Sequence, residues 1–321
     1  METEKVLVTG GAGFIGSHIA EALVRRGFEV KVIDNLSFGK KENLAGISKD
    51  VDFKKLDITN FEEIEKEFKG IDYVLHLAAL RSVIESTKHP NDYNLANING
   101  TVNVLEAAKR HNVKRVVFTS SSSVYGNTEK LPESESDSPN PLCPYALTKL
   151  VGEHYCRMYS QLYGLETVSL RYFNVFGPRQ EPKSSYAGVI PLFTFALMEN
   201  RQPTIFGDGL QSRDFTFVQD IVEANITAMK AKKENVCCES FNIARGEATT
   251  VLDLFGKIRS LLGKQNIEPK FLPARPGEAR RTLANPEKAK RLMGFECSIP
   301  FEEGLEQTVE WYEENGKEFA K

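Results

Sequence analysis

Short runs of β-branched and other apolar residues alternate with helix-like segments through the first half of the 321-residue chain. The expected strands are Val6–Thr9, Val30–Ile33, Tyr73–Leu77, Val116–Thr119 and Thr167–Leu170, and the expected helices are Ile15–Arg26, Phe61–Phe68, Asn99–His111 and Tyr145–Tyr163. Near-continuous apolar strands are typical of a sheet covered on both faces, and helices of crossover length join parallel strands. This alternation predicts an α/β chain with a doubly wound (Rossmann) parallel sheet.

The composition of the sequence changes after about residue 178, where prolines and glycines become frequent. Two further helical stretches follow, at 220–231 and 251–262, within a loop-rich context. We therefore expect two domains: residues 1–178 carry the parallel sheet, and residues 179–321 form a smaller α/β domain. Some interleaving of the chain between the two is also expected.

Composition restricts the partners of this chain. The 41 Lys and Arg residues nearly balance the 44 Asp and Glu residues, so we expect no nucleic-acid binding. The five cysteines lack metal-ligand spacing, which predicts neither a disulfide framework nor a metal site and suits a reducing cytoplasm. Because the sequence has no secretion signal and no apolar stretch of spanning length, we expect a cytoplasmic protein without membrane contacts.

A glycine-rich loop lies directly after the first expected strand and opens the first expected helix. Gly10 allows a tight turn, Gly13 lets backbone amides approach a pyrophosphate, and Gly16 lets the helix pack close to the strand. Asp34 ends the second strand, where a carboxylate accepts both ribose hydroxyls of an adenosine and repels a 2′-phosphate. The combination predicts a dinucleotide site that holds NAD rather than NADP.

A tyrosine and a lysine, Tyr145 and Lys149, stand four residues apart in the last expected helix of the sheet domain, so both project from one helix face. An ammonium beside a phenol stabilises the phenolate and is expected to lower the pKa of Tyr145 toward neutrality, which makes it an acid/base for a hydroxyl group. Ser121 ends the preceding strand at the carboxyl edge of the sheet, where it can hydrogen-bond the reacting hydroxyl. We take Tyr145, Lys149 and Ser121 as the candidate catalytic residues.

These motifs occur in a characteristic order: the glycine loop, Asp34, Ser121, the Tyr145/Lys149 pair and the segment Arg171–Pro178. On these residues the chain resembles an extended short-chain dehydrogenase/reductase. Within that superfamily it is similar to the nucleotide-sugar epimerases, the UDP-glucose and UDP-N-acetylglucosamine 4-epimerases. The resemblance covers essentially the whole chain and continues through 207–209, 212–215 and 275–278.

The resemblance implies that the first domain binds NAD and the second a UDP-sugar. The implied NAD-binding residues are Gly10, Gly13, Phe14, Ile15, Gly16, Asp34, Asn35, Asp57, Ile58, Leu77, Ala78, Ala79, Asn99, Tyr145, Lys149 and Tyr172. The implied substrate-binding residues are Ser122, Ser123, Asn174, Val189, Thr204, Arg213, Arg275, Glu278 and Thr282. By the same implication Asn174, Arg213 and Arg275 hold the diphosphate, Glu278 contacts the uridine ribose, and Asn99 orients Tyr145 or borders the nicotinamide.

The implied reaction inverts C4 of the sugar through a transient 4-keto intermediate without net redox change. The alternatives within the family are a nucleotide-sugar dehydratase and a UDP-glucuronate decarboxylase or epimerase. Related dehydratases and decarboxylases share the oxidation step, but they characteristically carry an acidic residue just after the serine, where this chain has Ser122 and Ser123. A net NAD-dependent dehydrogenase is a second enzyme alternative. A non-catalytic NAD-sensing regulator is the alternative from another class, and the presence of Tyr145, Lys149 and Ser121 disfavours it.

Two expectations concern the sugar and the assembly. In similar 4-epimerases the residue four positions beyond Glu278 borders the C2 substituent, and a small residue such as Thr282 leaves room for an N-acetyl group. We therefore expect turnover of UDP-GlcNAc/UDP-GalNAc, with UDP-Glc/UDP-Gal also accepted. Similar proteins are commonly homodimers that pair the helices near 99–111 and 145–163, so a homodimer is expected here.

Overall fold

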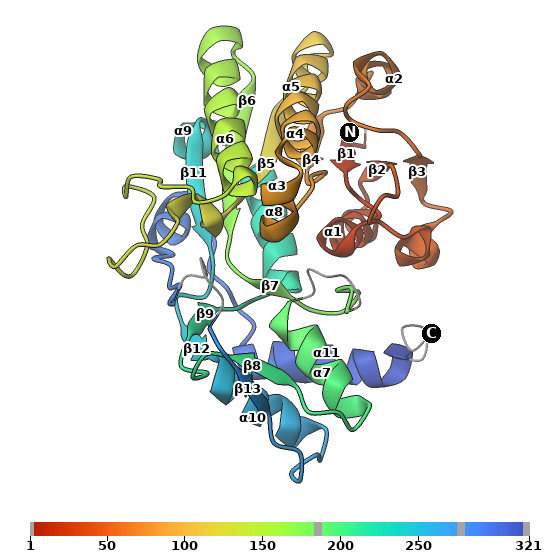
Figure 1. The fold of residues 1–321 in the computed structure, drawn as a ribbon. Helices are drawn as coiled ribbons and strands as arrows, with labels where there is room; N and C mark the ends of the chain where they lie inside the picture. Colours follow the sequence, from red (N-terminus) through yellow and green to blue (C-terminus); the bar gives the residue numbers. More distant parts are fainter. Residues whose placement is uncertain (1–2, 183–187, 275–279, 317–321) are drawn as a thin grey trace.

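The structure is a computed structural model that describes residues 3–182, 188–274 and 280–316. A parallel seven-stranded sheet in the order β11-β6-β5-β4-β1-β2-β3 forms its centre (Figure 1). Its strands are β1 Lys5–Thr9, β2 Glu29–Ile33, β3 Val51–Lys54, β4 Tyr73–His76, β5 Arg115–Ser121, β6 Glu166–Tyr172 and β11 Glu239–Ile243. The expected doubly wound sheet is confirmed. Its order reverses between β1 and β4, where such sheets open a ligand crevice at their carboxyl ends.

Helices cover both faces of the sheet. One face packs against α1 Phe14–Arg25 and α8 Val218–Lys230, and the other against α2 Phe61–Glu65, α5 Gly100–Arg110 and α6 Pro144–Tyr163. Short helices α3 Val83–Lys88 and α4 Pro90–Tyr93 lie between β4 and α5, and α9 Lys233–Val236 precedes β11. Side chains of β1 alternate between the two cores, Val6 and Val8 in one and Leu7 in the other, as burial on both faces requires.

A smaller lobe lies below the sheet in Figure 1 and has its own apolar core. Its helices are α7 Val189–Met198, α10 Val251–Leu261 and α11 Phe301–Asn315. Its strands form three short pairs: β7 Val175–Phe176 with β10 Thr216–Phe217, β9 Ser212–Asp214 with β12 Ala248–Thr250, and β8 Thr204–Phe206 with β13 Lys270–Leu272. None of the helices in the described ranges is long and apolar enough to cross a membrane.

Two strands of the central sheet were not expected from the sequence. The edge strand β3 mixes Asp52 and Lys54 into its run, and β11 carries the polar residues Ser240 and Asn242. Ser240 and Asn242 are buried, so tertiary partners rather than an apolar pattern specify this strand. Strand β11 and helix α8 both follow residue 178 in the chain. Nevertheless β11 is an edge strand of the central sheet, and α8 covers one of its faces.

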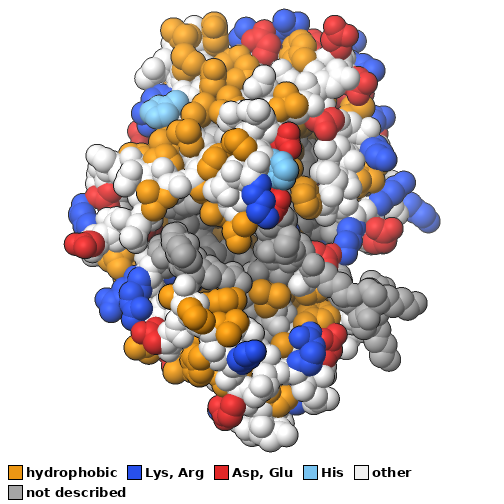
Figure 2. Space-filling model, viewed as in Figure 1, with side chains coloured by type: hydrophobic (Ala, Val, Ile, Leu, Met, Phe, Trp, Pro, Cys, Tyr) orange, Lys and Arg blue, Asp and Glu red, His pale blue; other side chains and the backbone are white. Residues whose placement is uncertain are grey.

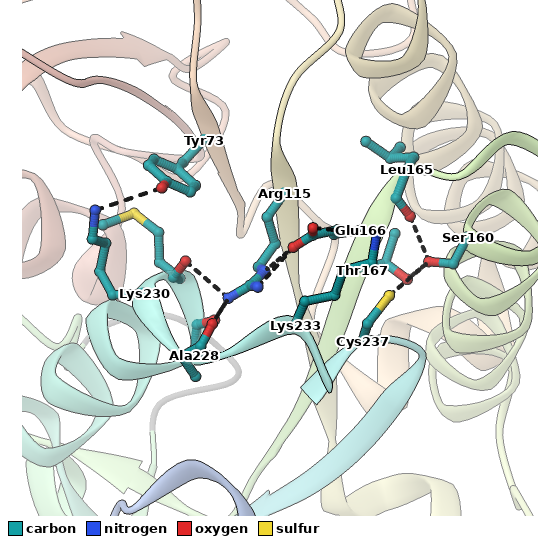
Figure 3. Close-up of polar contacts among 12 residues, drawn as sticks. Tyr73, Arg115, Ser160, Leu165, Glu166, Thr167, Ala228, Lys230, Lys233 and Cys237 are labelled. Atoms are coloured by element: carbon teal, nitrogen blue, oxygen red, sulfur yellow. Dashed lines mark hydrogen bonds and ion pairs between the residues drawn. The ribbon is translucent and has the colours of Figure 1, made fainter. Parts of the chain in front are cut away.

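The buried guanidinium of Arg115 holds α8 against the sheet at the start of β5 (Figure 3). Its Nη1 donates to the carbonyl oxygens of Ala228, Met229 and Ala231 at 2.8, 3.0 and 2.8 Å, which caps the carboxyl end of α8. Its Nη2 donates to Glu166 Oε2 at 2.7 Å. A cation at this helix end satisfies carbonyls that have no partner within the helix. Arg115 thus fixes a helix from the second half of the chain to a strand from the first.

The loop before α6 joins the segment 282–285 through Glu133. Its amide donates to Leu283 O at 2.7 Å, and its carbonyl accepts from Asn285 N at 2.8 Å. The Glu133 carboxyl is buried beside Asp214 of β9. Burial, with the nearby Asp214 and Asp137 carboxylates adding to it, raises the pKa of Glu133 to about 8. Glu133 therefore keeps its proton at neutral pH.

We expect Glu133→Gln to make the protein more stable than wild type at alkaline pH, because glutamine cannot ionise. Since the folded-state pKa is raised above the ordinary 4.5, the stability linked to this proton is complete below about pH 4.5 and is lost as the pH rises through about 8. The melting-temperature difference between variant and wild type should therefore grow from pH 5 to pH 9. The exposed Glu129→Gln change is the control. A difference that stays constant across this range would show that Glu133 is not the group involved.

Candidate active site

A cleft of about 1210 Å³ runs from the carboxyl ends of β1, β2, β4 and β5 to the smaller lobe. It lies at the point where the sheet order reverses. The predicted site residues that line it are Gly10, Gly13, Phe14, Ile15, Gly16, Asp34, Asn35, Asp57, Ile58, Leu77, Ala78, Ala79, Ser121, Ser122, Ser123, Tyr145, Lys149, Tyr172, Asn174, Val189, Thr204, Arg213 and Thr282. Arg275 and Glu278 lie outside the described residues. The fold therefore gathers residues from both ends of the chain into one cleft.

The glycine loop leaves no room for side chains where the turn closes. Gly10 has a φ of +70°, and a Cβ on it would lie 2.8 Å from Ala78 N. A Cβ on Gly16 would lie 2.2 Å from Gly10 O, so helix α1 can approach the loop only because residue 16 is glycine. Gly13 precedes α1 and faces the cleft, where the positive end of the helix attracts a pyrophosphate. This cradle fits a dinucleotide.

Asp34 lines the cleft just after β2. Its Oδ2 accepts from Ala12 N at 3.0 Å and its Oδ1 from Leu36 N at 2.8 Å, which fixes the carboxylate at the wall. Burial raises the pKa of Asp34, and these two backbone amides oppose that rise. Each carboxylate oxygen keeps capacity to accept a ribose hydroxyl. A negative group at this place fits NAD and repels a 2′-phosphate.

The catalytic candidates meet at the carboxyl edge of the sheet. Ser121 ends β5, Tyr145 lies in the first turn of α6, and Lys149 follows one turn later. A hydrogen bond joins the side chains of Ser121 and Tyr145. Lys149 Nζ donates to Thr119 O at 2.8 Å and lies 5.2 Å from the centroid of the Phe118 ring. The predicted grouping of these three side chains is found.

The electrostatics of this group differ from the sequence expectation. Burial raises the pKa of Tyr145, and the Ser121 hydrogen bond and the Arg81 guanidinium oppose the rise. Burial also lowers the pKa of Lys149 to about 8. The expected lowering of the Tyr145 pKa by Lys149 is therefore wrong: Lys149 is directed at the Thr119 carbonyl, and the cation that acts on the phenol is Arg81.

Asn99 is the one predicted residue in the described ranges that the structure leaves out of the cleft. It is exposed, whereas Asn97 is buried and turned inward. The Asn97 side chain bonds both backbone groups of Leu80, at 2.8 and 2.9 Å, and donates to Thr148 Oγ1 at 3.0 Å. Asn97 and Thr101 are four residues apart, so they lie on one helix face, and both are buried. This spacing is the sequence signal that could have identified the inward face.

The substrate side of the cleft is organised around Asn174. Its Nδ2 donates to Asp214 O at 3.1 Å and to Thr282 Oγ1 at 3.3 Å. The Asp214 amide also donates to Thr282 Oγ1 at 3.4 Å, so the small hydroxyl side chain is held from two sides. Arg213 lies next to this cluster on β9. These contacts place a cation and a small side chain on the same wall.

Besides Asp92 of α4, four charged residues that the sequence analysis did not single out also line the cleft: Lys40, Arg81, Arg179 and Glu181. Lys40 and Glu181 form an ion pair between the loop after β2 and the loop after β7. Arg179 pairs with Glu21 of α1 at 2.6 Å. These residues occupy irregular loops without periodicity, so nothing in the sequence marked them. In the described part of the chain no cluster of His, Cys, Asp or Glu could hold a metal ion.

Comparison with known proteins identifies the family. A model of the NAD dependent epimerase/dehydratase family matches residues 6–244. A putative UDP-glucose 4-epimerase of Methanocaldococcus jannaschii is 40% identical over 314 residues, which cover 97% of this chain and 99% of that protein.

Two solved structures share the fold over nearly the whole chain. The UDP-N-acetylglucosamine 4-epimerase of Methanobrevibacter ruminantium M1, in complex with UDP-N-acetylmuramic acid, has a TM-score of 0.93 at 41% identity and covers 98% of this chain and 100% of that one. The UDP-glucose 4-epimerase of Thermotoga maritima, with UDP-glucose, has a TM-score of 0.92 at 39% identity and covers 97% and 99%. Together with the glycine cradle and Asp34, these likenesses show that the chain is an NAD-dependent enzyme of the epimerase/dehydratase family.

Proposed function

We propose that this chain is a UDP-hexose 4-epimerase that inverts C4 of UDP-GlcNAc/UDP-GalNAc and of UDP-Glc/UDP-Gal. The observation that carries the proposal is the single cleft that joins Ser121, Tyr145 and Lys149 to Asn174 and Thr282. Bound NAD supplies reversible hydride acceptance at the reacting carbon. The protein supplies the proton transfer and the placement of the sugar.

Tyr145 is the acid/base for the 4-hydroxyl in this proposal. Because burial raises its pKa, the phenol needs help to release a proton, and the Ser121 hydrogen bond and the Arg81 cation stabilise the phenolate. Lys149, which lines the cleft one turn after Tyr145 and is fixed to Thr119 O, is proposed to hold the cofactor. The microscopic reverse returns the proton to the new 4-hydroxyl.

The remote nucleotide is the anchor for the substrate. Arg213, with the Asn174 amide beside it, offers donors suited to a diphosphate, and Arg275 and Glu278 are proposed to join them. Binding energy gathered on the UDP leaves the hexose free to turn its opposite face to the cofactor. Inversion rather than simple oxidation follows from that freedom.

Elimination chemistry has less support than epimerisation. Dehydration or decarboxylation needs an acid/base beside Ser121, and the next two residues are the neutral Ser122 and Ser123. In the described lining of the cleft the carboxylates are Asp34, Asp57, Asp92 and Glu181. None of these four belongs to β5 or to the turn that follows it. A non-catalytic NAD sensor is disfavoured by the assembled Ser121, Tyr145 and Lys149 group.

The small side chain of Thr282 supports the N-acetylated substrates. Its hydroxyl is bound by Asn174 and by the Asp214 amide, so the residue occupies little of the cleft it lines. The similar enzymes of M. ruminantium and T. maritima are named for the two sugar classes, which agrees with a pocket open to each.

The outer face of α6 supports a homodimer. Leu147, Met158 and Leu162 are exposed on it at spacings of eleven and four residues, which place them on one side of the helix. Val83 and Leu95, in the segments between β4 and α5, add further exposed apolar surface. Figure 2 shows apolar side chains gathered over the upper end of the molecule, where α6 lies. We propose a second copy of this chain as the occupant, packing helix against helix.

Replacing Tyr145 with Phe should leave the fold, NAD content and UDP binding intact but lower turnover at least about a hundredfold, because the proton-transfer group is lost. The rates of C4 inversion are compared by chromatography of the UDP-sugars. Tyr155→Phe, on the same helix outside the cleft, is the matched control and should keep wild-type turnover. Retention of most activity by Tyr145→Phe would assign the acid/base role to another residue.

Replacing Thr282 with Tyr should suppress turnover of UDP-GlcNAc about tenfold or more relative to UDP-Glc, because overfilling the pocket penalises the larger C2 substituent. The readout is the ratio of kcat/KM for the two substrates. Thr282→Ser keeps the hydroxyl that Asn174 binds and should preserve the wild-type ratio. An unchanged ratio in the Tyr variant would remove Thr282 from the specificity argument.

Replacing Leu162 with Glu should convert the dimer to a monomer, because a charge on the apolar face of α6 would be buried without a partner in the pair. Sedimentation velocity at micromolar concentration measures the change. Phe271→Glu, which changes another exposed apolar residue but on β13 of the smaller lobe, should leave the assembly unchanged. A wild-type protein that sediments as a monomer contradicts the dimer.

A further inference from the structure

A buried ion pair lies directly behind the catalytic residues. Glu153 of α6, one turn after Lys149, receives two hydrogen bonds from Arg171 of β6: Nε to Oε1 at 2.9 Å and Nη2 to Oε2 at 2.7 Å. Both side chains are 5% exposed or less. Ser120 and Ser240 also donate to the Glu153 carboxylate, at 2.5 and 3.1 Å. The pair therefore joins α6 to strands β5, β6 and β11 in one satisfied cluster.

Tyr125 continues this cluster toward the smaller lobe. Arg171 Nη1 donates to the Tyr125 hydroxyl at 2.8 Å, and that hydroxyl donates to Asn242 Oδ1 at 2.6 Å. The guanidinium also lies over the Tyr125 ring, 4.8 Å from its centroid. Tyr125 and Asn242 are both buried. One phenolic hydroxyl is thus the link between the ion pair and Asn242.

Asn242 extends these hydrogen bonds to the backbone near Thr282, on the side of the cleft proposed for the substrate. Its Nδ2 donates to Glu133 O at 2.9 Å and to Asn285 O at 3.4 Å. The Glu133 backbone in turn bonds Leu283 and Asn285, the residues that follow Thr282. A continuous set of buried hydrogen bonds therefore runs from the catalytic helix to the segment that carries Thr282.

The members of this set stand next to residues that line the cleft. Ser120 precedes Ser121, Arg171 precedes Tyr172, and Glu153 follows Lys149 by one turn. Tyr125 itself does not line the cleft, so any effect it has on the reaction acts through these neighbours. A misplacement of about 1 Å far from the chemistry can cost about a hundredfold in rate, so a link that fixes both walls has catalytic consequences.

We propose that Tyr125 is a positioning residue: its hydroxyl couples the Glu153–Arg171 pair beneath the catalytic group to Asn242 and the 282–285 segment. It thereby holds the 282–285 segment in a fixed position relative to Ser121, Tyr145 and Lys149. This inference rests on the proposed epimerase function.

The test is Tyr125→Phe in the whole 321-residue chain loaded with NAD. We expect kcat for UDP-sugar inversion to fall about tenfold to a hundredfold. NAD content and the dissociation constant for UDP should stay within about threefold of wild type. Tyr159→Phe is the matched control. It also removes the hydroxyl of a buried tyrosine, but Tyr159 lies on α6 and its hydroxyl bonds Glu106 away from the cleft. A purely structural role would lower the melting temperature of Tyr125→Phe and leave kcat of the folded, NAD-loaded protein within twofold of wild type, which would overturn the proposal.

A double-mutant cycle with Asn242→Ser tests the same link from its other side. If both residues act through one chain of hydrogen bonds, the double variant should be no slower than the slower single variant. Rate losses that multiply would overturn the coupling. If the wild-type protein inverts no UDP-sugar, the proposed function fails; an active wild type with an unaffected Tyr125→Phe variant rejects only the positioning role.

Discussion

The close packing of α6 against β5 is the constraint on which the site depends. A Cβ at Gly152 would lie 2.3 Å from Phe118 Cζ, so the helix reaches the strand only because residue 152 is glycine. At that separation Lys149 Nζ can lie against the Phe118 ring and donate to Thr119 O. The first turn of the helix then brings Tyr145 to Ser121. A larger residue at position 152 would separate the two elements and, with them, Tyr145 and Lys149 from Ser121.

Two different parts of the chain form the walls of the cleft. One is the rigid glycine loop with Asp34, and the other is contributed by the smaller lobe. The glycine loop is fixed by contacts too tight for any side chain, and Asp34 is held by two backbone amides. The opposite wall depends on polar links, chiefly those of Asn174 and the buried set through Asn242. In the proposed reaction, firm contacts to the cofactor and to the remote nucleotide of the substrate leave the hexose between them free to turn between two orientations.

The features that depend only on local geometry could be predicted from the sequence. Helical spacing alone places Tyr145 and Lys149 on one face, and the glycine loop follows from strand, turn and helix in order. Strand β11 could not be predicted, because its buried Ser240 and Asn242 depend on partners distant in sequence. The same holds for the pKa of Tyr145, since burial and the approach of Arg81 are tertiary properties. The exposure of Asn99 could not be predicted either, because the segment before α5 is a π-helix, Asn94–Asn99, which changes the face each residue presents.

The central claim is that the hydrogen removed from C4 stays within the enzyme and returns to the same carbon on the opposite face. The most direct measurement is the fate of deuterium placed at C4 of UDP-GlcNAc and of UDP-Glc, followed by mass spectrometry of the separated product. The account predicts complete retention of the label at C4 in the inverted sugar, and no uptake at C4 or C5 when unlabelled substrate reacts in D₂O. Loss of the C4 label to solvent, or deuterium appearing at C5, would contradict it and would indicate proton abstraction of the kind that leads to elimination.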